Sequence, residues 1–553
     1  MKLQSIIKRV ELHHVSSWMN DDVRPVESER RTWSFRTFHN FWLLINCNLS
    51  TFLTGSALIP LGLTWWQAII TIVIGNMLAT GALLLSSLAG SYYHINFPVF
   101  SRAVWGMWGS QFSIWNRIFL SFGIYTAPGF LYGFQSWIGG QCFYLILLSW
   151  DPKYEQRIPN TMPADIGATS AQFISYVVFC ILSLPFIWIP PHRLQKFFYF
   201  ASGVTIIFFL TLLIWALVTM GSGGFGTTLS PESATLPTGG PKSIGWLITL
   251  GIISTMGSIA AGILNQNDLA RFAKQPGSAI WGQAVAFPLY SIFSSVLGIL
   301  VVAATQKRFQ GEAIWNPPTL FVRLLEMDDS AGTRTAIFFA GLALCASQLG
   351  INITSNALAG GIDLASVFPR YINIRRGAYI TAILSPIVNP WRLVNTATTF
   401  LSVLSGYSIF LAPMSGLMTA SYLVVNKQKL KIDDLYRGNS ESIYWYTWGI
   451  NFRAPVAWIV GVAPCLPGFV AAVDKSVSVT DGAAEMYYIN YLYGFLSSAT
   501  LYILLHWIFP APAVEAFVRE APSSREIQRY YCDRWDIPLA ETLQTLKEDF
   551  KGT

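Results

Sequence analysis

Charged residues are scarce in this chain of 553 amino acids: Asp, Glu, Lys and Arg make up 12% of it, and apolar residues make up 53%. Soluble domains contain about 25% charged residues, so this chain has too few to cover its apolar surface in water. Uncharged runs of about 20 residues, the length that a helix needs to cross a bilayer, fill most of the sequence. The composition therefore predicts an all-α integral membrane protein.

The chain also lacks the sequence patterns of common enzymes and metal sites. It has no HExxH motif and no Gly-x-Ser-x-Gly motif, and none of its predicted membrane spans contains a pair of acidic residues. Its six cysteines form no CxxC pair and its histidines are scattered, so we expect no metal and no cofactor. The net charge of +7 comes from basic residues spread over loops, which argues against nucleic-acid binding. We expect no enzymatic activity.

The uncharged runs predict twelve membrane-spanning helices between residues 37 and 514. The count depends on the short run 377–391, for which a tilted, partial or re-entrant segment is an alternative. The tails, residues 1–36 and 515–553, are polar and charged and are expected to be solvated, and a role in trafficking or gating is the alternative. Lys and Arg concentrate in the N-terminal tail and in every second loop after it, which predicts that both termini are cytoplasmic. The sequence gives no indication of oligomeric state.

Two clusters of polar and small residues interrupt the uncharged runs, and they lie five spans apart. The first run contains Asn46, Cys47 and Asn48, and the sixth contains Gly257 and Ser258. Open backbone groups find no partner in lipid, so such clusters indicate helices that break beside a cavity. The spacing matches an inverted repeat of five helices plus five. Close packing of helices through small residues is the alternative interpretation.

Residues suited to binding a flat, polar molecule occur in the third and eighth spans. Trp137 and Gln141 are four residues apart and share a helical face, as do Asn352 and Asn356. A buried tryptophan can stack on a flat ring while a carboxamide hydrogen-bonds to the edge of the ring. The alternatives are that the tryptophan lies at a membrane interface and that the amides join helices. The pattern predicts a small heterocyclic ligand.

Two acidic residues lie beside uncharged helices. Asp268 follows the sixth span and Asp363 ends the eighth, and arginines occur nearby in both places. Acidic groups at membrane depth commonly relay protons, so both are candidates for proton coupling. A helix cap or an ion pair is the alternative role for each.

Several motifs, taken in order, resemble those of the nucleobase-cation-symport-1 family. They are Trp-x-x-x-Gln at 137–141, Asn-x-x-Asp-x-x-Arg-Phe at 265–272 and Asn-x-x-x-Asn at 352–356 followed by Phe-Pro-Arg at 368–370. Phe-Pro-Val at 97–99 and Trp-Asn-Arg at 115–117 are similar to the fungal uracil and allantoin permease branch.

The resemblance implies a LeuT-like transporter with a five-plus-five inverted repeat and two peripheral helices. Spans one, two, six and seven would move as a bundle against a scaffold of spans three, four, eight and nine. It further implies that Trp137 stacks on the substrate, that Gln141 and Asn356 hydrogen-bond to it, that Cys47 faces it and that Leu401 forms a gate.

Two departures from the family pattern bear on substrate and coupling. Ser258 and Ile259 stand where sodium-coupled relatives have a second aromatic residue, so this part of the substrate site would be one-sided. Gly350 and Ile351 stand where those relatives have two hydroxyl ligands for sodium, and apolar groups cannot replace oxygen ligands. We therefore expect proton coupling.

The resulting prediction is a proton-coupled symporter of the plasma membrane. It would carry a nucleobase or related heterocycle of the uracil and allantoin class into the cell by alternating access. Thiamine, a nucleoside or nicotinamide riboside are the alternative substrates. A nutrient sensor that binds ligand without transporting it is the alternative from another functional class.

Overall fold

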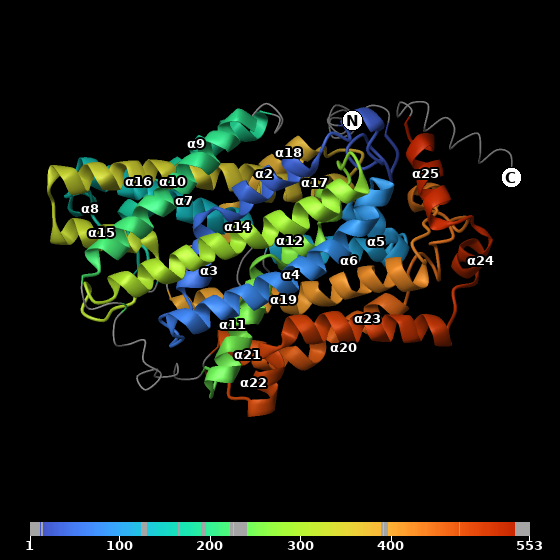
Figure 1. Cartoon of the computed structure of the whole chain (residues 1–553). Coiled ribbons are helices and arrows are strands. Elements are labelled where there is room, and N and C mark those ends of the chain that lie inside the picture. The colour runs from blue at the N-terminus through green and yellow to red at the C-terminus, as the bar shows by residue number, and fades with distance from the viewer. Residues whose placement is uncertain are drawn as a thin grey trace.

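All the regular secondary structure in the described part of the chain is helical. The computed structural model describes residues 11–12, 15–122, 130–163, 166–189, 195–221, 225, 240–388, 391, 396–474 and 476–536, and among these it contains no β-strand, only two isolated bridges. Figure 1 shows the long helices lying side by side along one direction. This agrees with the predicted all-α class.

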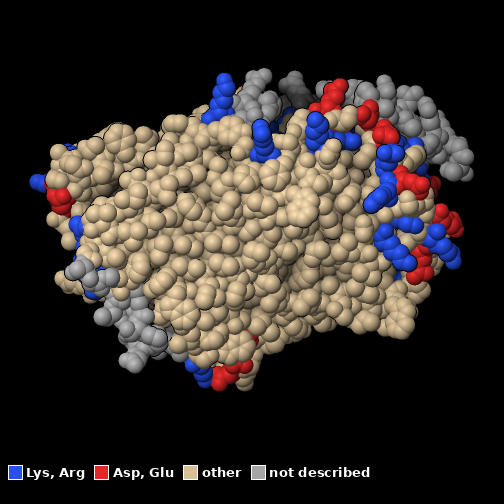
Figure 2. All heavy atoms as spheres, in the orientation of Figure 1, with Lys and Arg blue, Asp and Glu red and all other residues tan. Residues whose placement is uncertain are grey.

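Eight helical segments of the described chain are long and apolar enough to cross a membrane. They contain α4 (Trp65–Tyr93), α9 (Ser170–Trp188), α10 (Gln195–Thr219), α14 (Pro276–Thr305), α16 (Ala331–Ile351) with α17 (Leu358–Val367), α19 (Ala397–Ala420), α20 (Arg453–Val462) with α21 (Leu466–Val473), and α23 (Asn490–Ile508). In Figure 2 the middle of the molecule is a broad uncharged surface, and charged side chains gather at its ends and margins. A lipid bilayer favours this distribution because it cannot solvate charge.

The first and sixth predicted spans are each broken into two helices. The first consists of α2 (Phe35–Asn46) and α3 (Leu49–Ser56), and the sixth consists of α11 (Ile244–Ser258) and α12 (Ala260–Leu264). Both breaks fall at the polar clusters in the sequence, so this part of the prediction is confirmed.

The other helices are short or complete the remaining predicted spans. They are α5 (Phe97–Trp105), α6 (Gly109–Phe122), α7 (Phe130–Trp150), α8 (Tyr154–Arg157), α13 (Asn267–Ala270), α15 (Pro317–Met327), α18 (Ile374–Leu384), α22 (Asp481–Tyr488), α24 (Pro512–Glu520) and α25 (Ser524–Arg534). The third predicted span contains α7, and part of that span lies outside the described residues. The ninth corresponds to α18 followed by a 3-10 turn at Ser385–Val388, so it contains only a short α-helix.

The N-terminal segment and the loops around Arg102, Arg370 and Arg437, all predicted to be cytoplasmic, lie together at one end of the molecule, which we call the terminal end. There Arg102 donates to the carbonyl oxygens of Trp18 and Leu435, at 3.1 and 2.8 Å. At the other end Arg334 donates to the Ser149 carbonyl oxygen at 2.8 Å, so the end of α7 and the beginning of α16 meet there. Contacts between loops and helix ends thus form at two opposite ends of the helices, as the alternation of basic and non-basic loops along the chain requires.

The N-terminal segment is packed against the helices, which contradicts the expectation of a solvated tail. Met19 and Val23 are fully buried. Asn20 Nδ2 donates to the Pro369 carbonyl oxygen at 3.1 Å, and a carboxylate oxygen of Asp22 accepts from the Ile374 backbone N–H at 3.0 Å. A few apolar residues in a polar segment are enough to anchor it when its polar groups also find partners.

The two ends of the described chain also meet. The Ser28 hydroxyl donates to the Asp536 carboxylate at 2.6 Å, and the Ser28 backbone N–H donates to the same group at 2.9 Å. Figure 1 shows the blue segment before α2 and the red helix α25 on the same side of the molecule. This pairing again departs from two freely solvated tails.

Candidate functional site

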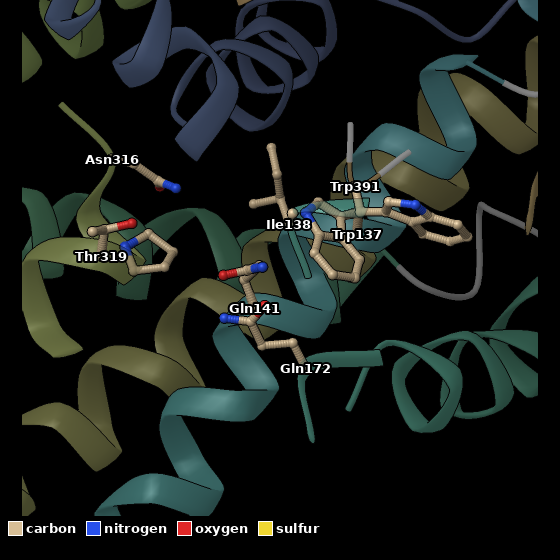
Figure 3. A pocket seen from close by; sticks show the side chains of 9 residues that line it. Trp137, Ile138, Gln141, Gln172, Asn316, Thr319 and Trp391 are labelled. Carbon is tan, nitrogen blue, oxygen red and sulfur yellow. The ribbon is translucent and has the colours of Figure 1, made fainter. Parts of the chain in front are cut away.

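A cavity of about 180 Å³ lies beside the middle of α7. Pockets for drug-sized ligands occupy about 300–1,000 Å³, so this cavity suits a small molecule. It is lined by Trp137, Ile138, Gln141, Gly167, Gln172, Asn316, Pro318, Thr319 and Trp391. Figure 3 shows Asn316 and Thr319 across the cavity from Ile138 and Trp137. Trp137 and Gln141, the pair predicted from their spacing, are therefore brought together.

Glycines in α7 set the position of this pair. A Cβ added at Gly139 would overlap the ring of Phe179, and a Cβ at Gly140 would overlap the backbone of Tyr176, both in α9. The absent side chains let α9 lie directly against α7. This close packing places Tyr176 edge to face with the Trp137 indole, with ring centroids 5.7 Å apart.

Trp391 is a site residue that the sequence reasoning missed. The Trp391 indole lines the cavity, and the residue is 8% exposed. The centroids of the Trp391 and Trp137 rings are 6.0 Å apart, and the ring planes meet at 65°. Aromatic pairs prefer such edge-to-face geometry, which fixes the orientation of both rings. In the sequence, Trp391 is visible only as the last residue of the short uncharged run 377–391. Nothing in the sequence indicates that the end of this run contacts α7.

Gln172 and the turn before α15 were also missed. Gln172 belongs to the first turn of α9, and its Oε1 accepts from the Thr169 backbone N–H at 3.2 Å in a capping box. Asn316 is the N-cap residue of α15, but its side chain makes no capping hydrogen bond. The cavity is thus rimmed by amide groups from three separate parts of the chain.

Asn352 and Asn356 lie in a π-helical turn, Asn352–Ala357, that joins α16 to α17. Asn356 Nδ2 donates to Asn352 Oδ1 at 3.0 Å, and Asn352 Nδ2 donates to Ser136 Oγ at 2.8 Å. The expected shared face of the two asparagines is therefore present, and it faces α7. Neither residue is among those that line the cavity, so Asn356 is not brought together with Gln141 there.

The break between α2 and α3 is organised by Asn48. Its Oδ1 accepts from the Thr51 backbone N–H at 3.1 Å, which caps α3, and its Nδ2 donates to the Ile45 carbonyl oxygen at the end of α2. Asn46 Nδ2 donates to the Phe287 carbonyl oxygen of α14 at 3.0 Å. Cys47 is buried at the break itself. Asn46 and Asn48 thus satisfy backbone groups, as residues that hold a broken helix must.

The break between α11 and α12 packs against α19. A Cβ at Gly257 would overlap the Leu404 carbonyl oxygen, and Ser254 Oγ donates to the Leu401 carbonyl oxygen at 3.3 Å. Ser258 Oγ donates to Thr255 within its own helix at 2.7 Å, and Ile259 forms the one-residue break. Ser258, Ile259 and the buried Leu401 do not line the cavity.

Asp268 and Asp363 converge on one arginine. Arg117 Nε donates to Asp363 Oδ2 at 2.7 Å, and Arg117 Nη2 forms a second contact with Asp363 Oδ1. The same Nη2 lies 3.6 Å from Asp268 Oδ2, and all three side chains are about 2% exposed. Asp268 Oδ1 accepts from the Phe97 backbone N–H at 2.8 Å. The ion-pair alternative is therefore present for both acids, which form a buried group with Arg117.

This arrangement suits binding and conformational change. An indole can stack on a flat, polar ring while carboxamides hydrogen-bond to its edge. A buried ionic group can respond to a proton. Among the described residues no three His, Cys, Asp or Glu side chains are grouped as metal ligands.

The comparisons with known proteins agree on one family. A family described as permease for cytosine/purines, uracil, thiamine and allantoin matches residues 25–494. The allantoin permease of Saccharomyces cerevisiae is 35% identical over 500 residues, which cover 89% of this chain and 76% of that protein. The uracil permease of the same yeast is 33% identical over 503 residues, again covering 89% and 76%.

A solved structure with the same fold is that of Mhp1, a nucleobase-cation-symport-1 family transporter, in a closed conformation with bromovinylhydantoin bound. The TM-score is 0.69 at 20% sequence identity, and the match covers 93% of this chain and 99% of Mhp1. The expected family is thereby confirmed, and its members are transporters rather than enzymes. This chain is a multi-pass membrane protein that belongs to the family of permeases for cytosine/purines, uracil, thiamine and allantoin.

Proposed function

We propose that this protein is a proton-coupled symporter that carries a nucleobase-like heterocycle of the uracil and allantoin class into the cell. It would act in the plasma membrane, with twelve spans in a five-plus-five repeat and both termini in the cytoplasm. The observation that carries the proposal is the cavity in which the Trp137 indole and the Gln141 carboxamide meet. Relatives named as allantoin, uracil and uridine permeases, at 33–35% identity, support this substrate class.

The chemistry of the site favours a flat ring that carries amide groups at its edge. Stacking of a base on an aromatic side chain contributes about 1–3 kcal/mol. A carboxamide both donates and accepts, so the Gln141 side chain, and in this proposal that of Asn356, can each pair with adjacent N–H and C=O groups at the edge of the ring. A site built on such pairing rejects molecules that lack the matching edge, since its own polar groups would then stay unpaired.

Proton coupling is supported by the surroundings of Gly350. A Cβ placed there would lie 3.1 Å from Leu44 Cδ1 and 3.9 Å from Ala201 Cβ, so its neighbours are apolar. The Gly350 carbonyl oxygen already accepts from Thr354 Oγ1 at 2.8 Å. A sodium ion prefers several oxygen ligands, and this position offers it few.

The buried acids are the candidate proton site. Arg117 contacts two carboxylates, those of Asp268 and Asp363, while Arg271 donates to the backbone carbonyl oxygen of Asp268 at 3.3 Å. Protonating one carboxylate would reduce the buried negative charge and loosen the link between α6, α13 and α17. In alternating access one helix bundle rocks against another around the binding site, and loosening this link would permit such movement at the terminal end.

The test is uptake of labelled uracil and allantoin into cells that lack their own permeases. We expect concentrative uptake that persists without sodium and collapses with a protonophore. Thiamine, uridine and nicotinamide riboside serve as competitors that define the substrate class. Saturable binding with no uptake would instead favour a sensor.

Two variants connect the uptake to the site. We expect Trp137→Ala and Asn356→Ala to abolish concentrative uptake at low substrate concentration while the protein still reaches the membrane. Asn439→Ala, which alters an exposed loop at the terminal end, is the control. Normal uptake by both site variants would refute the assignment.

A further inference from the structure

The cavity and Asn356 lie on opposite sides of Trp137. Helices α7 and α16 are antiparallel, because Cys345 Sγ contacts the Gly139 carbonyl oxygen whereas the later Asn352 contacts Ser136 and the Tyr132 carbonyl oxygen. Asn356 is four residues beyond Asn352, so it lies further toward the terminal end. Gln141 lies one helical turn beyond Trp137, on the side farther from the terminal end.

The cavity therefore occupies the side of Trp137 that faces away from the terminal end. Its far wall is the turn before α15, which lies in the long connection between α14 and α16. None of the residues predicted from the breaks in the first and sixth spans contributes to it. In the proposed orientation, this is the compartment that a substrate meets before it reaches Asn356.

Two carboxamides that line this compartment have no side-chain hydrogen bond to any residue that the structure describes. Asn316 occupies an N-cap position, where asparagine normally accepts from a backbone N–H, yet its side chain makes no such bond. Neither Asn316 nor Gln141 hydrogen-bonds through its side chain to another residue that the structure describes. Gln172 uses its Oε1 in the capping box, which leaves its Nε2 available. Unpaired amides that share a cavity with an indole are suited to a polar ring.

We infer that the cavity is a second, outer binding subsite for the heterocycle. The rings of Trp137 and Trp391 form its apolar wall, and Gln141, Gln172 and Asn316 hydrogen-bond to the amide edge of the ligand. The subsite selects cyclic amides, imides and ureides before they pass Trp137. It makes Asn316, far from the predicted site in the sequence, a specificity-determining residue. This inference rests on the proposed function.

The first test measures uptake kinetics of labelled uracil and allantoin in Asn316→Ala. Loss of one neutral hydrogen bond, about 0.5–1.5 kcal/mol, corresponds to a rise in KM of about twofold to tenfold. We expect that rise with nearly unchanged maximal velocity, and a changed ratio of the two KM values. Asn316→Ser and Thr319→Val are milder variants of the same wall, and Asn439→Ala is the control. Membrane levels are measured from a fluorescent fusion.

The second test separates the two sites by binding. Purified Asn356→Ala in nanodiscs should still bind labelled uracil or allantoin although it does not transport them, and adding Asn316→Ala should weaken that binding. Unchanged KM values in all the wall variants, or no binding by Asn356→Ala beside normal transport by the wild type, would overturn the outer subsite and leave the proposed function standing. Absence of both binding and uptake in the wild type would overturn both.

Discussion

Trp137 is the residue on which the proposed site depends most. Replacing it with alanine removes the stacking surface, worth about 1–3 kcal/mol, so we expect KM to rise about 5- to 150-fold. Trp137→Phe keeps an aromatic face and should have a smaller effect. Initial uptake rates over a range of substrate concentrations measure both. An equal, small effect of the two variants would show that stacking is unimportant.

Arg117 should matter for stability as well as transport. Arg117→Ala leaves the buried carboxylates of Asp268 and Asp363 without their shared cation, and removing one partner of a buried pair destabilises a protein by about 3–5 kcal/mol. We expect a lower melting temperature for the purified protein and less protein at the membrane. Melting curves followed by intrinsic fluorescence measure the first.

The matched control for Arg117 is Arg323→Ala. Arg323 pairs with Glu326 at 3.2 Å on the surface, where both side chains are about half exposed, and such pairs contribute about 0–1 kcal/mol. Arg323→Ala should therefore melt close to the wild type. Similar melting temperatures for the Arg117 and Arg323 variants would contradict the structural role of the buried group.

At the residue scale the sequence predicts contacts only over short distances. Trp137 and Gln141 follow from a spacing of four on one helix, and the same holds for Asn352 and Asn356. The convergence of Asp268 and Asp363 on Arg117 joins residues far apart in the chain, and no local pattern indicates it. The position of Trp391 was missed for the same reason.

Among the helices, the contact between α11 and α19 depends on Gly257. A side chain there would overlap the Leu404 carbonyl oxygen, and backbone cannot move aside as a flexible side chain can. We expect Gly257→Val to destabilise the protein by about 1–3 kcal/mol and to reduce transport. Protein level and uptake measured on the same cells test this.

Gly81→Val is the control at the element scale. Gly81 lies in α4, is exposed and has no atom near the position of an added Cβ. The same substitution should leave level and uptake nearly unchanged. If both glycine variants behave alike, the close approach at Gly257 does not explain the effect.

The helix breaks were predictable, but their surroundings were not. A polar residue in an apolar run commonly pairs with backbone groups that a helix break leaves open, so the position of Asn48 predicted that role. The turn before α15 reads as an ordinary polar loop, and only the folded chain places Asn316 against α7. Loops carry too little hydrophobic pattern to define where they pack.

On the scale of the whole molecule, the N-terminal segment is part of the fold. Val23→Asp would bury a charge without a partner, so we expect less protein at the membrane. Glu29→Ala changes an exposed side chain of the same segment that forms no ion pair with the described residues, so it should have little effect. Fluorescence of a C-terminal fusion, resolved by membrane fractionation, compares them. Equal levels would contradict the observed packing.

The tail was misjudged because its composition is polar. Its buried residues are few, and their partners lie in loops hundreds of residues away, as for Asn20 and the Pro369 carbonyl oxygen. Hydropathy distinguishes segments that face lipid from segments that lie outside the membrane. It does not distinguish a solvated segment from one that packs against other loops.

The most direct test of the whole account is transport by the purified protein in sodium-free liposomes. Labelled uracil and allantoin are supplied outside, and a pH gradient, acidic outside, is imposed. The account predicts accumulation above the outside concentration for at least one of them, abolished by a protonophore and by Trp137→Ala. Equilibration without accumulation, or accumulation only when a sodium gradient is supplied, would contradict it.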